Sequence, residues 1–465
     1  MIVRRRYTFV ALGLMASIAC VSEAPTPTPQ LPPLVEVRAD RALTFGDPHD
    51  ECQECHPQHV AEWEISPHAY SMRDPVFHAM VRLGQKQSQG KLGQFCVQCH
   101  SPVALAAGST PVYQDPESGA FRQDTEMVSP LEKKGVSCDV CHSMTEVIEP
   151  LNARAVLTPD GVRRSSISNP KANTAHASEY SSLHKDGLMC GMCHAVTNPK
   201  NARIEETFTE WKESSFGRPG GRTCQDCHMP AVVGPAAKDG PDRLIHRHTF
   251  VGVDVSLLPP EEFPGYDEMR MLAARLLRQS CDVRLAMDTT TKRLGIELEN
   301  LTGHSLPSGA TAERQMWVEL VVQDAYGRVV FETGTLDENG DLRDAEVGHS
   351  TRPGSDPQLI HYYQQMLDDP RITVATSTQP VKKVAFPWQA NAADNHVIAA
   401  DSTDRRSLDL STLPPGKYSA RFRLLFRTFP PYFLRELERL VQLDPAVKDR
   451  VPTVNIHEEA LTFEL

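Results

Sequence analysis

Aromatic residues are scarce in this 465-residue chain, at 6%, whereas proline occurs 36 times. Such a composition favours loops and offers few large side chains to bury, so the entropy lost on folding is hard to offset. The length nevertheless exceeds what one hydrophobic core usually organises, and we expect two domains and a targeting segment. A large apolar group bound inside one domain would supply the core that the side chains lack.

Clustered positive charge is also missing. The formal net charge is -12, and lysine and arginine are scattered along the sequence, so no surface that binds phosphate groups is expected. Nucleic acid is therefore not an expected partner. An acidic protein of this kind docks most readily to a basic or mixed-charge partner.

Long apolar runs do not occur after the N-terminus, so no later segment is expected to span a bilayer. Residues 1–20 combine a basic start, a short apolar stretch and Cys20 after Ala19, which predicts a signal peptide of the lipoprotein type. Ser17 departs from the leucine usual at its position, so cleavage without lipid is the alternative. Residues 21–46 form a predicted proline-rich tether. We expect an exported protein, in the periplasm or on the outer cell surface, anchored through a lipid on Cys20.

Cysteine occurs 12 times and, apart from Cys20 and Cys281, is confined to residues 52–227. Five segments repeat the pattern Cys-x-x-Cys-His. They are Cys52-Gln-Glu-Cys55-His56, Cys96-Val-Gln-Cys99-His100, Cys138-Asp-Val-Cys141-His142, Cys190-Gly-Met-Cys193-His194 and Cys224-Gln-Asp-Cys227-His228. Two intervening residues let both thiols reach the two vinyl groups of one haem, and the adjacent histidine can bind its iron. We therefore predict five covalently bound c-type haems. Zinc ribbons, redox dithiols and structural disulfides are the alternatives, and none requires a histidine after each cysteine pair.

Each haem iron has a second axial position, so a low-spin electron carrier needs five further ligands. The sequence holds 18 histidines, and five of those outside the motifs are our candidates: His68, His176, His184, His248 and His304. His246 lies two residues before His248 and would point the opposite way in an extended segment. The reserves are His59 and His78, and the sulfur alternatives are Met72 and Met80. His304 lies in a Gly/Pro-rich loop far along the chain, so its ligation would make the C-terminal region part of the electron carrier.

The sequence pattern changes near residue 256. Residues 47–256 lack sustained periodicity and predict a mainly α-helical and irregular domain that carries five haems, followed by a connecting segment and helix over 257–281. Period-two alternation then predicts strands at 294–298, 317–322, 329–332 and 418–426, with a hairpin turn at 325–327. We expect residues 282–465 to form an antiparallel β-sandwich domain of immunoglobulin-like type. Cys281 is interpreted as a small buried hydrophobic residue.

Residues 50–256 resemble the multihaem c-type cytochromes related to hydroxylamine oxidoreductase and to the tetrahaem cytochrome that accepts its electrons. The segments that carry the resemblance are Trp63-Glu-Ile-Ser-Pro-His68-Ala, Phe95-Cys-Val-Gln-Cys-His-Ser-Pro, Gly135-Val-Ser-Cys-Asp-Val-Cys-His, Thr209-Glu-Trp211-Lys-Glu-Ser, Cys224-Gln-Asp-Cys-His-Met-Pro230 and His248-Thr-Phe250. The resemblance implies a mostly helical fold with closely stacked, mainly bis-histidine haems, in which His68 and His248 match distal-ligand positions. The Cys-x-x-Cys-Lys variant of the related pentahaem nitrite reductases does not occur here, and the C-terminal domain is additional.

Three functions fit these patterns. The first is electron transfer between redox partners, such as donor and acceptor cytochromes or a membrane quinol-linked complex. The second is oxidation or reduction of small nitrogen or sulfur compounds at one haem with an open axial position. In the third, the β-sandwich is a module that binds another protein while the haems serve it. The surplus of histidines favours the first.

Overall fold

The computed structural model describes residues 35–37, 45–110, 112–115, 117–119, 121–123, 128–344 and 355–465. The predicted signal peptide, Cys20 and most of the tether lie outside these ranges. Residues Leu34–Leu465 form one compact unit. Within the described ranges, no helix combines the length and the apolar character that a membrane span requires.

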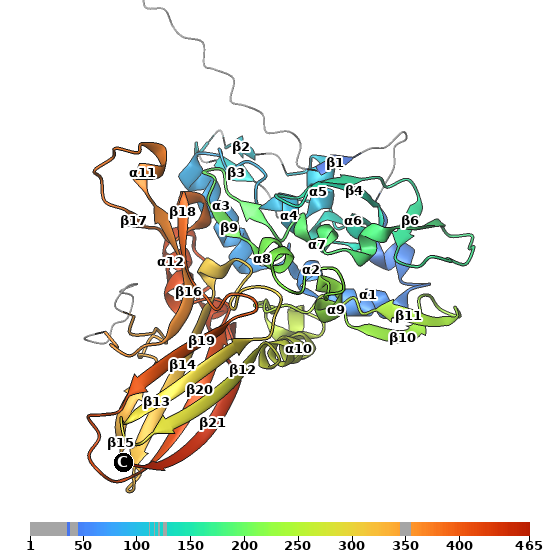
Figure 1. The fold of residues 1–465 in the computed structure, drawn as a ribbon. Coiled ribbons are helices and arrows are strands. Elements are labelled where there is room, and N and C mark those ends of the chain that lie inside the picture. Colours follow the sequence, from blue (N-terminus) through green and yellow to red (C-terminus); the bar gives the residue numbers. More distant parts are fainter. Residues whose placement is uncertain are drawn as a thin grey trace, which may run out of the picture. The chain divides into compact units, whose positions relative to one another are not determined.

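The haem-motif region, residues 47–256, contains short helices (Figure 1). They are α1 (Pro57–Glu64), α2 (Pro67–Tyr70), α3 (Pro75–Ser88), α4 (Val97–His100), α5 (Pro102–Ala107), α6 (Cys138–His142), α7 (Leu188–Gly191), α8 (Thr207–Glu213) and α9 (Cys224–His228). Ser66, Asp74 and Ser101 cap α2, α3 and α5 by accepting a hydrogen bond from the first turn, and a proline follows each cap. Proline has no N–H to leave unpaired at that position. The abundant proline therefore starts helices as well as forming loops.

Short strand pairs lie between these helices, and the sequence analysis did not predict them. The antiparallel pairs are β2 (Val112–Gln114) with β3 (Phe121–Gln123), β4 (Met144–Glu149) with β5 (Arg154–Leu157), β8 (Val196–Thr197) with β9 (Arg203–Glu205) and β10 (Ala231–Pro235) with β11 (Asp242–His246). The parallel pairs are β6 (Val162–Ser165) with β7 (Ala177–Tyr180) and β1 (Val35–Val37) with β5. Strands of two to six residues are too short to leave a period-two pattern in the sequence.

Helix α10 (Tyr266–Arg278) connects this region to the C-terminal β region, residues 282–465, and lies within the predicted connecting segment and helix over 257–281. The strands that follow are β12 (Cys281–Asp288), β13 (Arg293–Asn300), β14 (Gln315–Asp324), β15 (Val329–Thr333), β16 (His361–Asp368), β17 (Lys382–Lys383), β18 (Ala392–His396), β19 (Thr403–Asp409), β20 (Lys417–Arg427) and β21 (Val454–Glu464). One antiparallel sheet has the order β12-β13-β19. A second has the order β17-β16-β14-β20-β21, with β15 on β14 and β18 on β16. The predicted hairpin turn is present, because the Asp324 N–H donates to the Arg328 carbonyl at 3.0 Å.

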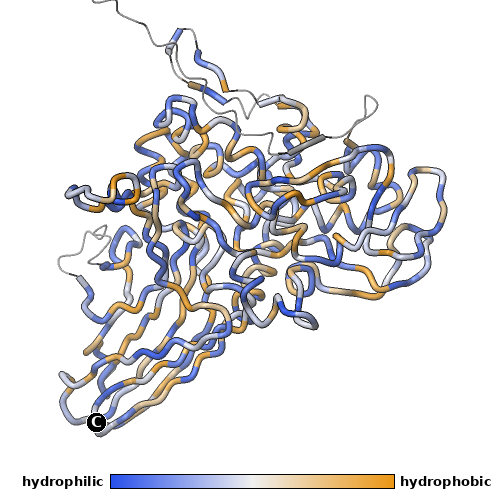
Figure 2. The backbone as a smooth tube through the Cα atoms, turned by 45° about the horizontal axis from the view of Figure 1, so that its top comes forward, coloured by the Kyte–Doolittle hydropathy of each residue, from blue (hydrophilic) through white to orange (hydrophobic). Residues whose placement is uncertain are grey.

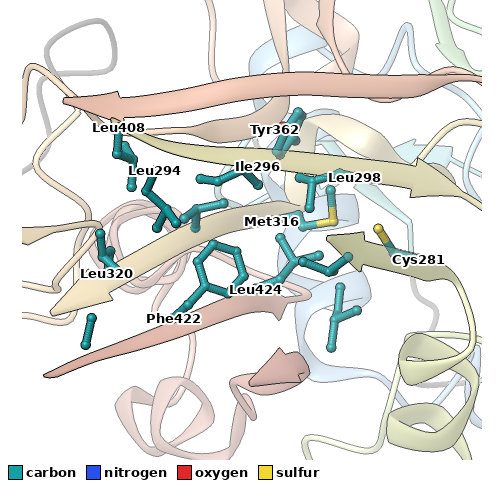
Figure 3. Close-up of a cluster of buried hydrophobic side chains, with 14 of the residues drawn as sticks. Cys281, Leu294, Ile296, Leu298, Met316, Leu320, Tyr362, Leu408, Phe422 and Leu424 are labelled. Carbon is teal, nitrogen blue, oxygen red and sulfur yellow. The ribbon is translucent and has the colours of Figure 1, made fainter. Parts of the chain in front are cut away.

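Side chains of both sheets meet in one core (Figure 3). Leu294 and Leu298 come from the smaller sheet, whereas Leu320 and Phe422 come from the larger one, and all four are almost fully buried. Hydrophilic and hydrophobic residues alternate along these strands (Figure 2), as in β20, where every second residue from Tyr418 to Leu424 is buried. This alternation is why the strands were predictable. The immunoglobulin-like arrangement of the strands stays a prediction.

The β region also contains helices that the sequence analysis missed, α11 (Pro370–Thr373) and α12 (Pro431–Val441). Helix α12 begins at a proline and buries Phe433 and Leu437 against Val76 and Leu83 of α3. The haem-motif region and the β region therefore share a hydrophobic cluster in addition to the sheet core.

Candidate haem sites

Each motif forms one helical turn. The His56 N–H donates to the Cys52 carbonyl at 2.8 Å, and the His194 N–H donates to the Cys190 carbonyl at 3.0 Å. The third and fifth motifs are the helices α6 and α9, and the second ends in α4. Residues i, i+3 and i+4 of a helical turn lie on one face. Two thiols and one imidazole therefore face the same side, as attachment to the edge and iron of a single haem requires.

The five motif histidines are held in the same way. Each ring contacts an oxygen through Nδ1: His56 with Ala236 O at 2.7 Å, His100 with Ser71 O at 3.2 Å, His142 with Arg164 O at 2.6 Å, His194 with Glu205 Oε1 at 2.9 Å, and His228 with Val251 O at 2.5 Å. When Nδ1–H donates to an oxygen, Nε2 carries the lone pair that binds a metal. The chain thus presents five Nε2 atoms suited to iron, which fits the predicted cofactor.

A second imidazole faces four of the motif histidines. The ring centroids lie 6.3 Å apart for His56 and His176, 6.3 Å for His142 and His248, 6.5 Å for His194 and His68, and 6.4 Å for His228 and His304. With a metal–imidazole bond of about 2 Å on each side, two rings on one metal ion have centroids about 6 Å apart. The structure therefore brings four predicted distal histidines to the spacing of bis-histidine iron. Their ligation stays a prediction.

His184, the fifth predicted distal ligand, faces a histidine that already has a partner. Its ring centroid lies 5.4 Å from that of His142, which His248 also faces. An iron bound to His142 has only one further axial position, so His184 and His248 compete for the same role. His248 has the spacing that two ligands require, and its Nδ1 contacts the His246 carbonyl at 3.0 Å, which leaves Nε2 available. Two of the five predicted distal histidines therefore face the same motif histidine, and their ligation stays a prediction.

The second motif differs from the other four. Among the described residues, the ring contact of His100 is with Phe77, whose ring stacks on it at 4.1 Å, and none of the five distal candidates faces it. Met72 is buried in a hydrophobic cluster that also contains Phe77, and the partly buried Cys96 packs against this cluster. The reserve His78 contacts the Met72 carbonyl through Nε2 at 2.9 Å. The reserve His78 also lowers the pKa of His100, so it lies nearer the second motif than any of the five distal candidates.

Cysteines of different motifs are close enough to shift one another's pKa. Cys138 lowers the pKa of Cys52, Cys99 raises the pKa of Cys193, and Cys190 lowers the pKa of Cys224. The third and fourth motifs are neighbours as well, because Cys141 and Cys193 interact electrostatically. The contact order is first to third to fourth, with the second and fifth motifs both on the fourth. The fourth motif is therefore the junction of the set.

Burial has its strongest effect on a few of the thiols. Burial raises the pKa of Cys96 and Cys141 to about 12. Such thiols are protonated at neutral pH, whereas zinc binding and disulfide exchange need the thiolate. In the described ranges no group of three or more His, Cys, Asp or Glu side chains is arranged to hold a bare metal ion. Cys281 is buried, as predicted, and burial raises its pKa to about 12.

The histidines at these sites are mostly neutral. Burial lowers the pKa of His68 and His184 to about 3 and the pKa of His228 to about 4. Neutral imidazole is the form that binds a metal. His194 is the exception: burial lowers its pKa, but the hydrogen bond and charge of Glu205 outweigh burial and raise it to about 9.

Helix α8 holds the loop that carries His304. The Glu210 carboxylate accepts hydrogen bonds from the Ser305 N–H at 3.0 Å and from the Ser308 hydroxyl at 2.7 Å. The Asn300 amide donates to the His304 carbonyl at 2.8 Å. The β region therefore delivers a histidine to the fifth motif. The sequence analysis missed Glu205 and Glu210, because no motif marks them; the only signal was that Glu210 lies in one of the segments that carry the family resemblance.

Residues 51–143, which contain the first three motifs, match the family model of cytochrome c554 and c-prime. The chain is also similar to the crystal structure of a penta-heme cytochrome c552 from Thermochromatium tepidum, with a TM-score of 0.60, 17% sequence identity, and coverage of 89% of this chain and 98% of that chain. At that identity the likeness shows the fold. No curated protein matches the sequence. The motifs, the family match and the fold together support a multihaem c-type cytochrome with covalently bound haem c.

Proposed function

We propose that this protein is an extracytoplasmic electron-transfer cytochrome with five covalently bound haems. The observation that carries the proposal is the five Cys-x-x-Cys-His turns together with the proximity of their thiols, which affect one another from the first motif through the third to the fourth, and from there to the second and fifth. Haem, when bound, supplies a one-electron iron couple at each motif. Redox centres held this close exchange electrons without a mobile carrier.

The chain's own residues provide what such a relay needs. Ten cysteines form the attachment points, and the oxygen contacts at Nδ1 fix the orientation of each motif histidine. Distal imidazoles face four of the motif histidines, and with haem bound they would take the second axial position and exclude substrate there. This arrangement supports transfer between protein partners, such as donor and acceptor cytochromes or a membrane quinol-linked complex. Export and a lipid anchor on Cys20 are part of the same proposal, and the sequence of residues 1–20 supports them.

Haem stoichiometry tests the proposal directly. The protein, expressed with its own N-terminus in a host that matures c-type cytochromes, should yield five haems per chain in the pyridine haemochrome assay. A Cys224→Ala and Cys227→Ala double variant should lose one haem. The matched control is Cys281→Ala, a cysteine outside the motifs, which should lose none. Haem-free protein, or a motif variant with unchanged haem content, would contradict the proposal.

The second motif favours a second candidate, an oxidoreductase of small nitrogen or sulfur compounds. The observation is that the ring of Phe77 stacks on His100 at 4.1 Å and that none of the five distal candidates faces this histidine. A substrate needs such an unfilled axial position. The EPR spectrum of the oxidised protein decides between the two: a high-spin signal that shifts on adding nitrite or hydroxylamine supports the enzyme, and low-spin signals alone support the carrier.

We also propose that the haem-motif region is related to the cytochromes that surround hydroxylamine oxidoreductase. Two residues that match distal-ligand positions of that group support this: His68 faces the fourth motif, and His248 faces the third. A structure with haem bound would test it, because the relation requires these two imidazoles on those two irons.

A further inference from the structure

One motif histidine has a different partner from the other four. At His56, His100, His142 and His228 the oxygen at Nδ1 is a backbone carbonyl, which is neutral. At His194 it is the carboxylate of Glu205, at 2.9 Å.

The structure places Glu205 with little freedom to move. Glu205 is the last residue of β9 and pairs with Val196 of β8. Val196 lies two residues after His194 in the sequence. Its side chain is 16% exposed. On the other side, the Phe208 N–H donates to the His194 carbonyl at 2.9 Å. Backbone pairing on both sides of the contact thus sets the distance between the carboxylate and the imidazole.

The position of this motif within the set gives the contact its importance. The fourth motif touches the second through Cys193 and the fifth through Cys190, and it adjoins the third. The fourth motif therefore lies between the first and third motifs on one side and the second and fifth on the other, on the route that electrons between these pairs would take. A residue that changes the redox equilibrium here acts on every route that includes the fourth motif.

We propose that Glu205 is a positioning residue that gives the haem of the fourth motif the lowest reduction potential of the five. A carboxylate that accepts the Nδ1 proton makes the imidazole a stronger electron donor to the iron, and its negative charge favours the ferric over the ferrous state. The backbone carbonyls at the other four motifs do this much less. The inference rests on the proposed function, because it requires haem at His194.

The test is a spectroelectrochemical titration of the full-length protein together with its haem count. Glu205→Gln keeps the size of the side chain and removes its charge, and Glu205→Ala removes the contact. Glu206→Gln is the matched control: it removes the same charge one residue away, where the carboxylate pairs with Arg203 at 2.9 Å. Comparison with this control cancels the effect of net charge.

We expect both Glu205 variants to raise the lowest midpoint by an amount that changes the reduced-to-oxidised ratio at least tenfold, which is 59 mV for a one-electron couple. The EPR g-values of one low-spin haem should shift as well, and Glu206→Gln should change neither quantity. Five haems with midpoints equal to those of the control would overturn the inference and leave the proposed function intact. A wild-type protein without haem would overturn both. If Glu205→Gln does not accumulate, Glu205→Ala carries the same expectation.

Discussion

Replacing Glu210 with alanine should loosen the His304 loop and change the spin state of one iron. The carboxylate accepts hydrogen bonds from the Ser305 N–H and the Ser308 hydroxyl, and Ser305 is buried. A hydrogen bond to a charged group contributes about 1.5–3 kcal/mol, so losing two at a partly exposed carboxylate should cost about 3 kcal/mol. At about 1.4 kcal/mol for each factor of ten, the ratio of docked to undocked loop should fall roughly a hundredfold.

The measurement is the fraction of high-spin iron in the EPR spectrum of the oxidised protein. His304→Ala sets the full effect, one haem in five. Glu213→Ala, an exposed glutamate on the same helix, is the control for charge and helix propensity. If His304→Ala leaves every haem low-spin, His304 is not a ligand. If Glu210→Ala matches Glu213→Ala while His304→Ala has its effect, Glu210 does not hold the loop.

Three further predictions concern stability. Gly135 has φ +68°, and a methyl group there would lie 2.5 Å from the His68 carbonyl oxygen. Gly135→Ala should therefore lower the free energy of unfolding by at least about 1–3 kcal/mol in guanidinium unfolding. An unchanged unfolding midpoint would contradict this close contact between Gly135 and His68. Phe422 is fully buried between the sheets, so Phe422→Ala should cost about 3–5 kcal/mol in the same assay; a loss below about 1 kcal/mol would mean that the core is not closed there. Burial raises the pKa of the Asp74 carboxyl group from 3.8 to about 6, so the folded protein binds a proton on this group more tightly than the unfolded chain does. The free energy of unfolding should therefore fall as pH rises from about 4 to 6. Asp74→Asn keeps the helix cap and should remove that pH dependence, as unfolding at pH 4, 5, 6 and 7 would show.

The sequence was most informative where chemistry depends on residues adjacent in the chain. Cys-x-x-Cys-His is complete within five residues, and one helical turn places its groups correctly whatever surrounds it. The strands of the β region were equally accessible, because Tyr418 to Leu424 alternates between core and solvent. Helix α12 was not, since its buried residues Phe433 and Leu437 follow two prolines that read as a loop.

The pairing of histidines could not be predicted, because it depends on contacts between distant parts of the chain. His68 follows the first motif in sequence but faces His194 of the fourth. His184 and His248 come to the same ring, that of His142, although each had been expected to serve a separate iron. The sequence shows which histidines are available as distal ligands. The motif histidine that each one faces is set by the packing of distant segments.

The place of His304 in the chain has a consequence for assembly. During synthesis all five attachment motifs emerge before the loop between β13 and β14, so the last iron site is begun in one part of the chain and finished in another. A copy that ended before residue 300 would keep its ten motif cysteines and lack the imidazole opposite His228. With His304 as the predicted ligand, folding of the C-terminal sheets would be needed to complete the fifth haem site, and a truncated product would be expected to have one haem without its distal histidine.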